Sequence, residues 1–287
     1  MEININDITF IIVTYKSESV IKICLDTLPK QSKKIIVENS NNIELKNDLE
    51  SNYDNIEVIM NENLGMGASN NVGIHLSKTK YVYILNPDAK FKENTIGNLL
   101  RTAQNIKDFS IISPKHEDDT YPNYKIYTNN NSEELSKEII SVDTIDGFSM
   151  LINKEKFINE SIFDEKIFLY LENDDLCLRS KMQGDDLYII KNSLIEHSGS
   201  SSTGIENKKL EYLRNWHWMW SKFYFNKKHY GYLVAVFKVF KNLVSAKIKF
   251  FYYLITLNTF KRKIYQMRLS GLISSMIGKN SYYRPKL

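Results

Sequence analysis

Strand-like and helix-like segments alternate over the first 85 residues, and this alternation constrains the fold more than any other feature of the chain. Apolar runs rich in β-branched residues predict strands at 8–13, 35–37, 56–59 and 81–85. Such runs are typical of parallel strands, because a strand covered on both faces needs no polar alternation. Helical patterns lie between them, at 17–28, 43–51 and from the stretch 63–71 to about residue 77. We therefore predict an α/β fold with a doubly wound, mostly parallel sheet.

The pattern changes after residue 100, where short strands are separated by polar stretches. Strands are predicted at 110–113, at 142–153 with a break at a glycine, and at 187–190, whereas 116–137 is expected to be irregular. An aromatic strand at 168–171 leads into a helix that begins near residue 172. We expect this half of the chain to add mixed strands to the parallel first half.

The strand at 81–85 stops at Asn86-Pro87-Asp88, because proline cannot donate to a strand ladder and biases the preceding residue away from helix. Asn86 and Asp88 thus follow the carboxyl end of a parallel strand, where open α/β sheets bind their ligands. An oxygen ligand there suits a hard divalent cation that also holds substrate phosphates. A plain turn with a solvated aspartate explains these three residues equally well.

The loop after the third strand contains Gly65 and Gly67 just before a helix. It resembles part of a dinucleotide-binding fingerprint, but Asn70 replaces the third glycine, and the first strand–helix turn contains no glycine. These departures argue against a dinucleotide-dependent dehydrogenase. The loop still allows the backbone to approach a nucleotide at a helix N-terminus.

Three acids, Glu172, Asp174 and Asp175, open the helix that follows the predicted aromatic strand. Acids near a helix N-terminus offset the positive end of its dipole, which explains one or two of them. Clustered carboxylates also raise each other's pKa, which favours a general base. Further along, His197 heads a loop rich in serine and glycine that suits phosphates, so it is a candidate metal or phosphate ligand.

Charge divides the chain near residue 205. Residues 206–287 hold 17 Lys and Arg against 2 Asp and Glu, a net charge of +15, so residues 1–205 carry −11 of the total of +4. All three tryptophans lie in the basic part. We expect two domains, 1–205 and 206–287, the second a helical tail.

The tail carries apolar side chains at helical spacing from Leu233 to Phe251, with lysines and other polar residues opposite. Basic residues interleaved with aromatic ones suit an anionic membrane surface, although an ordinary packed helix explains the first turns equally well. Nucleic acid is not an expected partner, because the acidic body would repel its phosphates. We expect no signal peptide, because the first residues lack a basic segment followed by a long apolar run, and no apolar run approaches the ~18 residues of a membrane span. We expect a cytoplasmic protein, peripheral on the inner face of the cell membrane.

Several stretches jointly resemble a family 2 glycosyltransferase of the GT-A fold, and most of all its bacterial rhamnosyltransferase-type branch. They occur in the family's order over about residues 1–202: FIIVTYKS from Phe10, IVENS from Ile36, ENLGMGASNN from Glu62, LNPD from Leu85, FDE from Phe163, ENDDLCLR from Glu172, and His197. Each stretch is a weak signal alone, and together they are a strong one.

The resemblance implies an inverting transfer from a nucleotide-diphosphate sugar, linked to UDP or dTDP, to a glycan or polyprenyl-linked acceptor in surface polysaccharide or lipopolysaccharide synthesis. It implies that Thr14, Tyr15 and Glu38 contact the nucleotide, with Thr14 and Glu38 at the base and ribose. The other nucleotide-binding positions that it implies are Asn63, Gly67, Asn70 and Asn86. It also implies Mg²⁺ or Mn²⁺ bound by Asp88, with His197 as a second ligand.

Two departures from the family pattern matter. The LNPD stretch leaves one carboxylate, Asp88, for the metal. The family's usual base falls at Asn173, which cannot take a proton. The base is then Glu172, Asp174 or Asp175, and Glu172 is favoured because it directly follows the predicted strand.

Other classes of protein remain as alternatives. A glycoside hydrolase uses two carboxylates and does not explain the phosphate-type loop or Asp88, so it is disfavoured. A sugar nucleotidyltransferase is disfavoured because the first strand–helix turn lacks a glycine-rich loop. Asn173 keeps open a non-catalytic glycosyltransferase-like subunit that binds nucleotide or glycan.

Overall fold

The structure is a computed structural model that describes residues 3–106, 108–127, 134–157, 161–199 and 208–285. The chain forms two compact units. The first comprises Met1–Asp164 and Asn173–Gly204, and the second comprises Glu165–Glu172 and Ile205–Leu287. The segment Glu165–Glu172 therefore groups with the second unit, whereas the sequence analysis placed it in the first domain.

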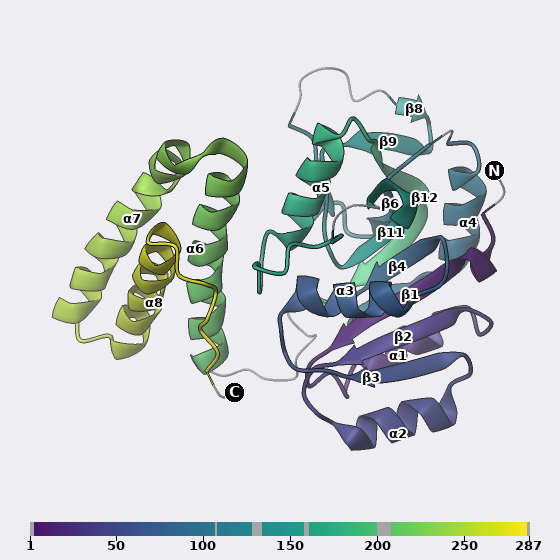
Figure 1. Cartoon of the computed structure of the whole chain (residues 1–287), viewed down its shortest axis with the longest axis horizontal. Coiled ribbons are helices and arrows are strands. Elements are labelled where there is room, and N and C mark those ends of the chain that lie inside the picture. The colour runs from purple at the N-terminus through teal and green to yellow at the C-terminus, as the bar shows by residue number, and fades with distance from the viewer. Residues whose placement is uncertain (1–2, 107, 128–133, 158–160, 200–207, 286–287) are drawn as a thin grey trace. The chain divides into compact units, whose positions relative to one another are not determined.

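The first unit is built on one ten-stranded sheet with the order β3-β2-β1-β4-β11-β6-β12-β9-β8, to which β5 adds by pairing with β12 (Figure 1). The strands of this sheet are β1 (Ile8–Thr14), β2 (Lys33–Glu38), β3 (Ile56–Met60), β4 (Tyr81–Leu85), β5 (Ala89–Phe91), β6 (Ile111–His116), β8 (Glu134–Ser136), β9 (Ile139–Val142), β11 (Ser149–Asn153) and β12 (Leu187–His197). β1 to β4 are parallel, and β11 runs antiparallel to β4 and β6. This mixed α/β sheet confirms the predicted fold class.

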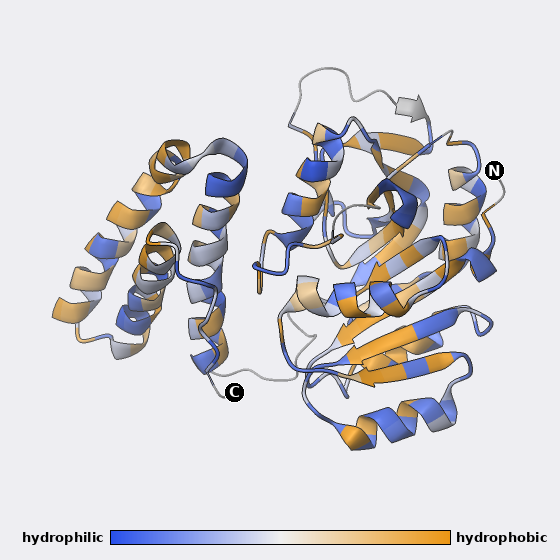
Figure 2. Cartoon of the chain, viewed as in Figure 1, coloured by the Kyte–Doolittle hydropathy of each residue, from blue (hydrophilic) through white to orange (hydrophobic). Residues whose placement is uncertain are grey.

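Helices cover both faces of the sheet, as the apolar strands require. The core on one face includes residues of α1 (Ile21–Asp26), α2 (Ile43–Asn52) and α4 (Thr95–Ala103), and the core on the other includes residues of α3 (Met66–Leu76) and α5 (Glu172–Met182). Every residue of β1 is buried, so its sequence needs no alternation. Figure 2 shows the same feature as continuous apolar strands in the centre of the unit.

Close packing holds α3 against β1. A Cβ atom on Gly73 would lie 2.5 Å from Cγ2 of Ile11, which is fully buried. Only glycine allows this approach. It fixes the helix that follows the Gly65-Met66-Gly67 loop, and thereby the loop itself.

Several predicted elements have other bounds in the structure. The first helix is short, because the N–H groups of Val20 and Ile21 bond to the Ser17 carbonyl in a turn before α1. The predicted strand at 142–153 is split: β10 (Thr144–Ile145) pairs with β7 (Tyr124–Lys125), and β11 begins only at Ser149. β7 and β8 lie inside the stretch predicted to be irregular, of which 128–133 falls outside the described residues.

The predicted aromatic strand at 168–171 does not form. Tyr170 and Leu171 both have left-handed backbones, with φ of 70° and 68°. Phe168 packs on the His217 ring with 4.6 Å between ring centroids, and Ser221 donates to the Leu169 carbonyl at 2.8 Å. Phe168 is therefore buried against the second unit's own helix and not in a sheet, and residues 169–171 are only partly buried.

The second unit contains α6 (Lys208–Tyr230), α7 (Tyr232–Ile255) and α8 (Thr259–Met276) (Figure 1). The approach of α6 and α8 depends on Gly271, because a Cβ atom there would lie 2.2 Å from the Trp216 carbonyl oxygen. Trp216, Trp220 and Phe223 fill the centre of the unit. Within the described parts of the chain, no helix combines the length and apolar character that crossing a membrane requires.

Candidate active site

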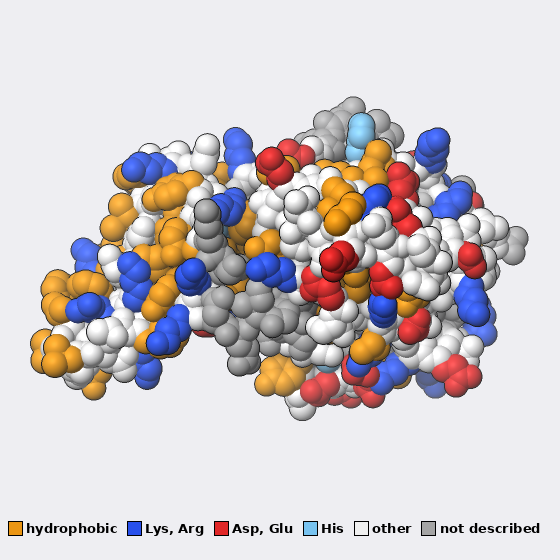
Figure 3. All heavy atoms as spheres, turned by 90° about the horizontal axis from the view of Figure 1, so that it is seen from below, with side chains coloured by type: hydrophobic (Ala, Val, Ile, Leu, Met, Phe, Trp, Pro, Cys, Tyr) orange, Lys and Arg blue, Asp and Glu red, His pale blue; other side chains and the backbone are white. Residues whose placement is uncertain are grey.

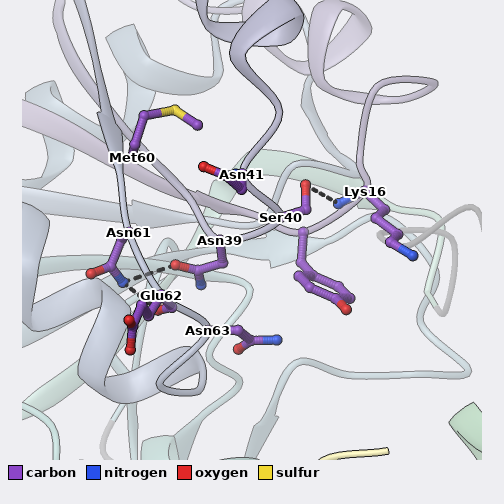
Figure 4. A pocket seen from close by; sticks show the side chains of 9 residues that line it. Lys16, Asn39, Ser40, Asn41, Met60, Asn61, Glu62 and Asn63 are labelled. Atoms are coloured by element: carbon purple, nitrogen blue, oxygen red, sulfur yellow. Dashed lines mark hydrogen bonds between the residues drawn. The ribbon is translucent and has the colours of Figure 1, made fainter. Parts of the chain in front are cut away.

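The strand order places a topological switch point at β1. The chain leaves β1 for β2 on one side, and β4 pairs with β1 on the other. Open α/β sheets bind ligands outside the carboxyl ends of the strands at such a point. A cavity of about 590 Å³ opens there, beyond the ends of β1, β2 and β3 (Figure 4). It is lined by Tyr15, Lys16, Asn39, Ser40, Asn41, Met60, Asn61, Glu62 and Asn63.

Thr14 and Glu38 form the buried support of this cavity and do not line it. The Thr14 hydroxyl donates to the Glu38 carboxylate at 2.5 Å, and both residues are fully buried. The other carboxylate oxygen accepts from the Ser40 N–H at 2.5 Å and from the Ser40 hydroxyl. Glu38 thus fixes the turn after β2. Of the predicted nucleotide contacts, Tyr15 and Asn63 line the cavity directly.

A chain of amides orders the cavity wall. Asn61 donates to the Asn39 side-chain oxygen at 2.9 Å, and Asn39 donates to the Ser69 hydroxyl at 2.8 Å (Figure 4). The Asn63 side chain accepts from the Gly65 N–H at 3.3 Å, which ties the wall to the loop before α3. Amide groups donate and accept, so this wall suits the polar edge of a nucleotide base or a ribose.

Two further predicted nucleotide positions, Gly67 and Asn70, lie within α3 and are buried. The neighbouring Asn71 has a structural partner. Its amide exchanges two hydrogen bonds with the Phe163 backbone, of 2.8 and 3.0 Å. These bonds hold the FDE stretch against α3.

Asp88 is a buried carboxylate that accepts no hydrogen bond from the described residues. It is 2% exposed, and neither of its oxygens has a hydrogen-bond partner. The side-chain oxygen of Asn86 is also buried and has no hydrogen-bond partner among the described residues. Buried acceptors normally find donors, so three such oxygens following β4 call for an explanation. A plain turn with a solvated aspartate is not what the structure contains.

His197, the last residue of β12, faces these groups. Its Nε2 lies 3.2 Å from Oδ1 of Asp88 and 3.4 Å from Nδ2 of Asn86. Its ring stacks on Phe148, with 4.1 Å between centroids and 7° between planes. Phe148 also accepts from the Asn86 N–H at 2.9 Å. The structure thus brings together Asn86, Asp88 and His197, which the sequence analysis had singled out separately.

This donor set fits a divalent cation. Within the described residues, no group of three or more His, Cys, Asp or Glu side chains has the arrangement of a metal site. Mg²⁺, however, is often bound through one or two carboxylates while substrate phosphates and water complete its shell. Asp88 supplies unpartnered oxygens and His197 a nitrogen, which leaves the remaining positions for a diphosphate.

The acidic stretch at the start of α5 divides into different environments. The Asp175 carboxylate is fully buried and pairs with Nε of Arg179 at 2.9 Å, which gives it a structural role. Asp174 lies 4.0 Å from Nζ of Lys125, and burial raises its pKa despite this lysine. Glu172 begins α5 but groups with the second unit. The strand that favoured Glu172 as base is absent.

Sequence reasoning missed Asp146, which lies in the turn between β10 and β11. Burial raises the pKa of its carboxyl, and the charge of Asp174 raises it further, whereas Lys125, His197 and His116 lower it. The sequence predicted a strand at 142–153 with a break at a glycine, but it assigned no role to the aspartate beside that glycine. The Asp146-Gly147 dipeptide, a common turn signal, could have revealed it.

The comparison with models of protein families shows to which family the chain belongs. A model described as glycosyl transferase family 2 matches residues 9–173, which is more than half of the chain. The chain belongs to glycosyl transferase family 2. The matched range includes the cavity, Asp88 and Asn173.

Two curated relatives are glycosyltransferases. Rhamnosyltransferase WbbL of Escherichia coli (strain K12) is 25% identical over 210 residues, which cover 63% of this chain and 79% of WbbL. Low-salt glycan biosynthesis hexosyltransferase Agl10 of Haloferax volcanii is 28% identical over 196 residues, which cover 62% of this chain and 63% of Agl10. The family and these relatives support glycosyltransferase activity for this chain.

Two solved structures share its GT-A fold at low sequence identity. GalNAc-T7 with UDP, GalNAc and Mn²⁺ matches with a TM-score of 0.56 at 13% identity, over 83% of this glycosyltransferase and 57% of that chain. S. aureus TarS 1-349 matches with a TM-score of 0.51 at 12% identity, over 96% and 93%. The predicted GT-A fold is thereby confirmed.

Proposed function

We propose that this glycosyltransferase moves a hexosyl unit, with inversion, from a UDP- or dTDP-linked sugar to a hydroxyl of a glycan or polyprenyl-linked acceptor. The observation that carries the proposal is the pairing of two features at one sheet edge. The amide-lined cavity beyond β1 to β3 suits a nucleoside, and the unpartnered Asp88 after β4 suits the cation of a diphosphate.

Asp88 and His197 are the residues that would hold Mg²⁺ or Mn²⁺. When bound, such a cation neutralises the charge that develops on the leaving diphosphate. Asn86 lies beside both residues, and its unpartnered side-chain oxygen is available to a donor on the substrate or on a bound water. The structure of GalNAc-T7 with UDP and Mn²⁺, which shares the fold, supports a divalent cation as part of the proposal.

The acceptor hydroxyl is a poor nucleophile until a base takes its proton. A single displacement with inversion needs one such base. Glu172 and Asp174 are the candidates that the sequence analysis retains, and Asp175 is the weakest because Arg179 occupies its carboxylate.

The biological setting that we propose is the synthesis of a bacterial surface polysaccharide or lipopolysaccharide. Support comes from the two curated relatives, a rhamnosyltransferase and a glycan biosynthesis hexosyltransferase. Rhamnose is therefore the first sugar to test.

Screening donor hydrolysis and transfer across UDP-, dTDP- and GDP-sugars tests this function. We expect turnover of at least one UDP- or dTDP-sugar that requires Mg²⁺ or Mn²⁺. A chain that binds nucleotides but consumes no donor with any acceptor would instead be the non-catalytic subunit that Asn173 suggests.

We further propose that α7 attaches the protein to the inner face of the cell membrane. Its exposed apolar side chains follow helical spacing, and Leu233 and Phe237 are each 83% exposed. The helix contains four lysines and no acid. Figure 3 shows basic side chains between exposed apolar ones over the helical unit. Such a face fits anionic lipid headgroups better than a second copy of an equally basic surface.

Replacing Phe237 and Ile248 together by serine tests the attachment. Both side chains are largely exposed, so the unit should stay folded while binding to anionic vesicles falls. Removing α7 and α8 is a weaker test, because both helices pack on α6. The matched control replaces the exposed Tyr121 and Tyr127 of the first unit by serine. Equal sedimentation of all three proteins with phosphatidylglycerol vesicles would reject the membrane role.

A further inference from the structure

Asn173 occupies the position where the family's base is expected, and the structure shows what its side chain does. Its Nδ2 donates to the Ile145 carbonyl at 3.0 Å. A Cβ atom added to Gly147 would lie 3.2 Å from the Asn173 Cβ. The amide therefore packs against the turn between β10 and β11. The residue between Ile145 and Gly147 in that turn is Asp146.

This turn also reaches the proposed metal-binding edge. Phe148, two residues after Asp146, stacks on His197 and accepts from the Asn86 N–H. The Asp146 N–H donates to the Asn123 carbonyl at 2.8 Å, which fixes the backbone at that residue. Asp146 thus lies on a rigid turn between Asn173 and the residues that face Asp88.

The charges around Asp146 come from four elements. Lys125 of β7, His116 of β6 and His197 of β12 favour its ionised form, whereas Asp174 of α5 opposes it. Burial is the largest influence, and the net effect raises the pKa of the Asp146 carboxyl. A raised pKa makes a carboxylate a better proton acceptor.

Asp146 and Asp174 differ in the cationic side chains that lie near their carboxylates. Asp174 has Lys125 at 4.0 Å, and Asp175 has Arg179. Within the described residues, no cation lies within 4.0 Å of the Asp146 carboxylate. Asp146 is also only partly buried, so an acceptor hydroxyl can reach it.

We propose that Asp146 is the catalytic base of this enzyme and supplies the carboxylate that Asn173 lacks. The inference rests on the proposed function. The acceptor O–H bond breaks and its proton passes to Asp146, while the acceptor oxygen forms a bond to the anomeric carbon. The bond from that carbon to the phosphate oxygen breaks, and the nucleoside diphosphate leaves with the electron pair.

The main experiment measures sugar transfer by Asp146→Asn, using the UDP- or dTDP-sugar that the parent consumes. Loss of a general base costs about 10²–10⁴-fold in kcat. Affinity for UDP or dTDP with Mn²⁺ should change by less than about twofold, since a general base acts on the acceptor hydroxyl and not on the nucleotide. Asp146→Glu retains a carboxylate and should recover part of the rate. The control is Asp118→Asn, which removes an exposed acid and should transfer at the parent rate.

The pH profile provides a second measurement that a structural role would not move. Lys125 lowers the pKa of the Asp146 carboxyl, so Lys125→Met should shift the acidic limb of kcat/KM to higher pH. Asp174 raises the same pKa, so Asp174→Asn should shift that limb to lower pH. In the Asp146→Asn background, Asn173→Asp should restore transfer, because it returns a carboxylate to the adjacent position.

Each outcome bears on the proposal. Transfer by Asp146→Asn at the parent rate overturns the proposal. The proposal also fails if Asp146→Asn remains active while Asp174→Asn or Glu172→Gln abolishes transfer. If Asp146→Asn does not fold, transfer by Asp146→Glu and the pH profiles of Lys125→Met and Asp174→Asn test the proposal. Profiles of kcat/KM that match the parent's would then reject Asp146 as the base. If the parent consumes no donor, the proposed function fails and this inference fails with it.

Discussion

Two histidines lie beside buried polar groups, one in each unit, and their surroundings differ. In the first unit, His197 faces the carboxylate of Asp88, whose buried oxygens accept no hydrogen bond from the described residues. In the second unit, His217 is fully buried and both of its ring nitrogens have partners. Its Nε2 lies 2.9 Å from the Tyr283 carbonyl, and its Nδ1 lies 3.0 Å from the Ser281 hydroxyl.

The surroundings of His217 keep its ring neutral. Its Nε2 lies between the Tyr283 carbonyl, which can only accept, and Nη1 of Arg284 at 3.2 Å, which can only donate, and its Nδ1 lies beside the Ser281 hydroxyl. Burial lowers the pKa of His217 to about 3, and the Arg284 charge lowers it too, against a raising effect of the Tyr283 carbonyl. The ring is therefore neutral. Arg284 in turn lies over the Phe168 ring at 3.3 Å from its centroid, which ties the C-terminal segment to Glu165–Glu172.

This difference in hydrogen-bond partners distinguishes a group that stabilises the fold from one that is expected to bind a ligand. A buried network with all partners in place stabilises one packing arrangement. A buried carboxylate without donors costs stability and is retained where a ligand supplies the missing partner. By this criterion we propose that the edge at Asp88 is a ligand site and that the His217 network is part of the fold.

The largest expected effect is on activity at the first of these regions. Asp88→Asn keeps the shape but removes the charge that would hold the cation, and removing one charge-stabilising group typically costs about 10²–10³-fold in kcat. Folding stability without metal should stay equal or rise, because the carboxylate accepts no hydrogen bond from the described residues that the change would remove. Transfer rates and urea unfolding of the same preparation check both parts. An Asp88→Asn variant that is active but less stable than the parent would show that Asp88 has a structural role and is not a ligand residue.

A smaller effect is expected from packing in the second unit. Gly271→Ala places a methyl group against the Trp216 carbonyl oxygen, and overpacking of this kind costs about 1–3 kcal/mol of unfolding free energy. Gly97→Ala in α4 is the matched control, because nothing lies within 4 Å of its added Cβ. It should raise stability by about 0.5–1 kcal/mol. Equal stability of the two variants in urea would contradict the close contact of α6 and α8.

The smallest effect is a pH dependence of stability. The pKa of His217 is about 3 in the folded chain and about 6.5 when unfolded, so the unfolded state binds more protons between these values. Its contribution is complete above pH 6.5 and is lost as pH falls toward 3. From pH 7 to 5.5 the parent should lose about 1 kcal/mol more than His217→Gln in urea unfolding. Identical slopes for both proteins would show that His217 is not buried as a neutral ring.

Much of the fold could be predicted from the sequence, because β1 to β4 are apolar on both faces and stop at polar turns. The elements that were missed depend on distant partners. Phe168 looks like part of a strand, but its position follows from His217 and Arg284, far along the chain. The pairing of β7 with β10 was likewise not expected, because it joins Thr144–Ile145 to Tyr124–Lys125, which lie within a stretch predicted to be irregular.

Asn86 and Asp88 could be selected from the sequence as candidate site residues, because both follow the carboxyl end of β4. The roles of Thr14 and Glu38 were not, because their mutual hydrogen bond depends on the register of β1 against β2. Asp146 was missed for the same reason, since its neighbours Lys125, Asp174 and His197 come from three other elements.

The most direct test of the central claim is calorimetric titration of the protein with UDP and with dTDP, in Mn²⁺, in Mg²⁺ and in EDTA. If the unpartnered oxygens of Asp88 await a cation and a diphosphate, one nucleotide should bind at least about tenfold more tightly with metal, a difference of about 1.4 kcal/mol. Asp88→Asn should bind equally with and without metal, at the parent's EDTA level. Equal affinity of the parent in metal and in EDTA would contradict the account.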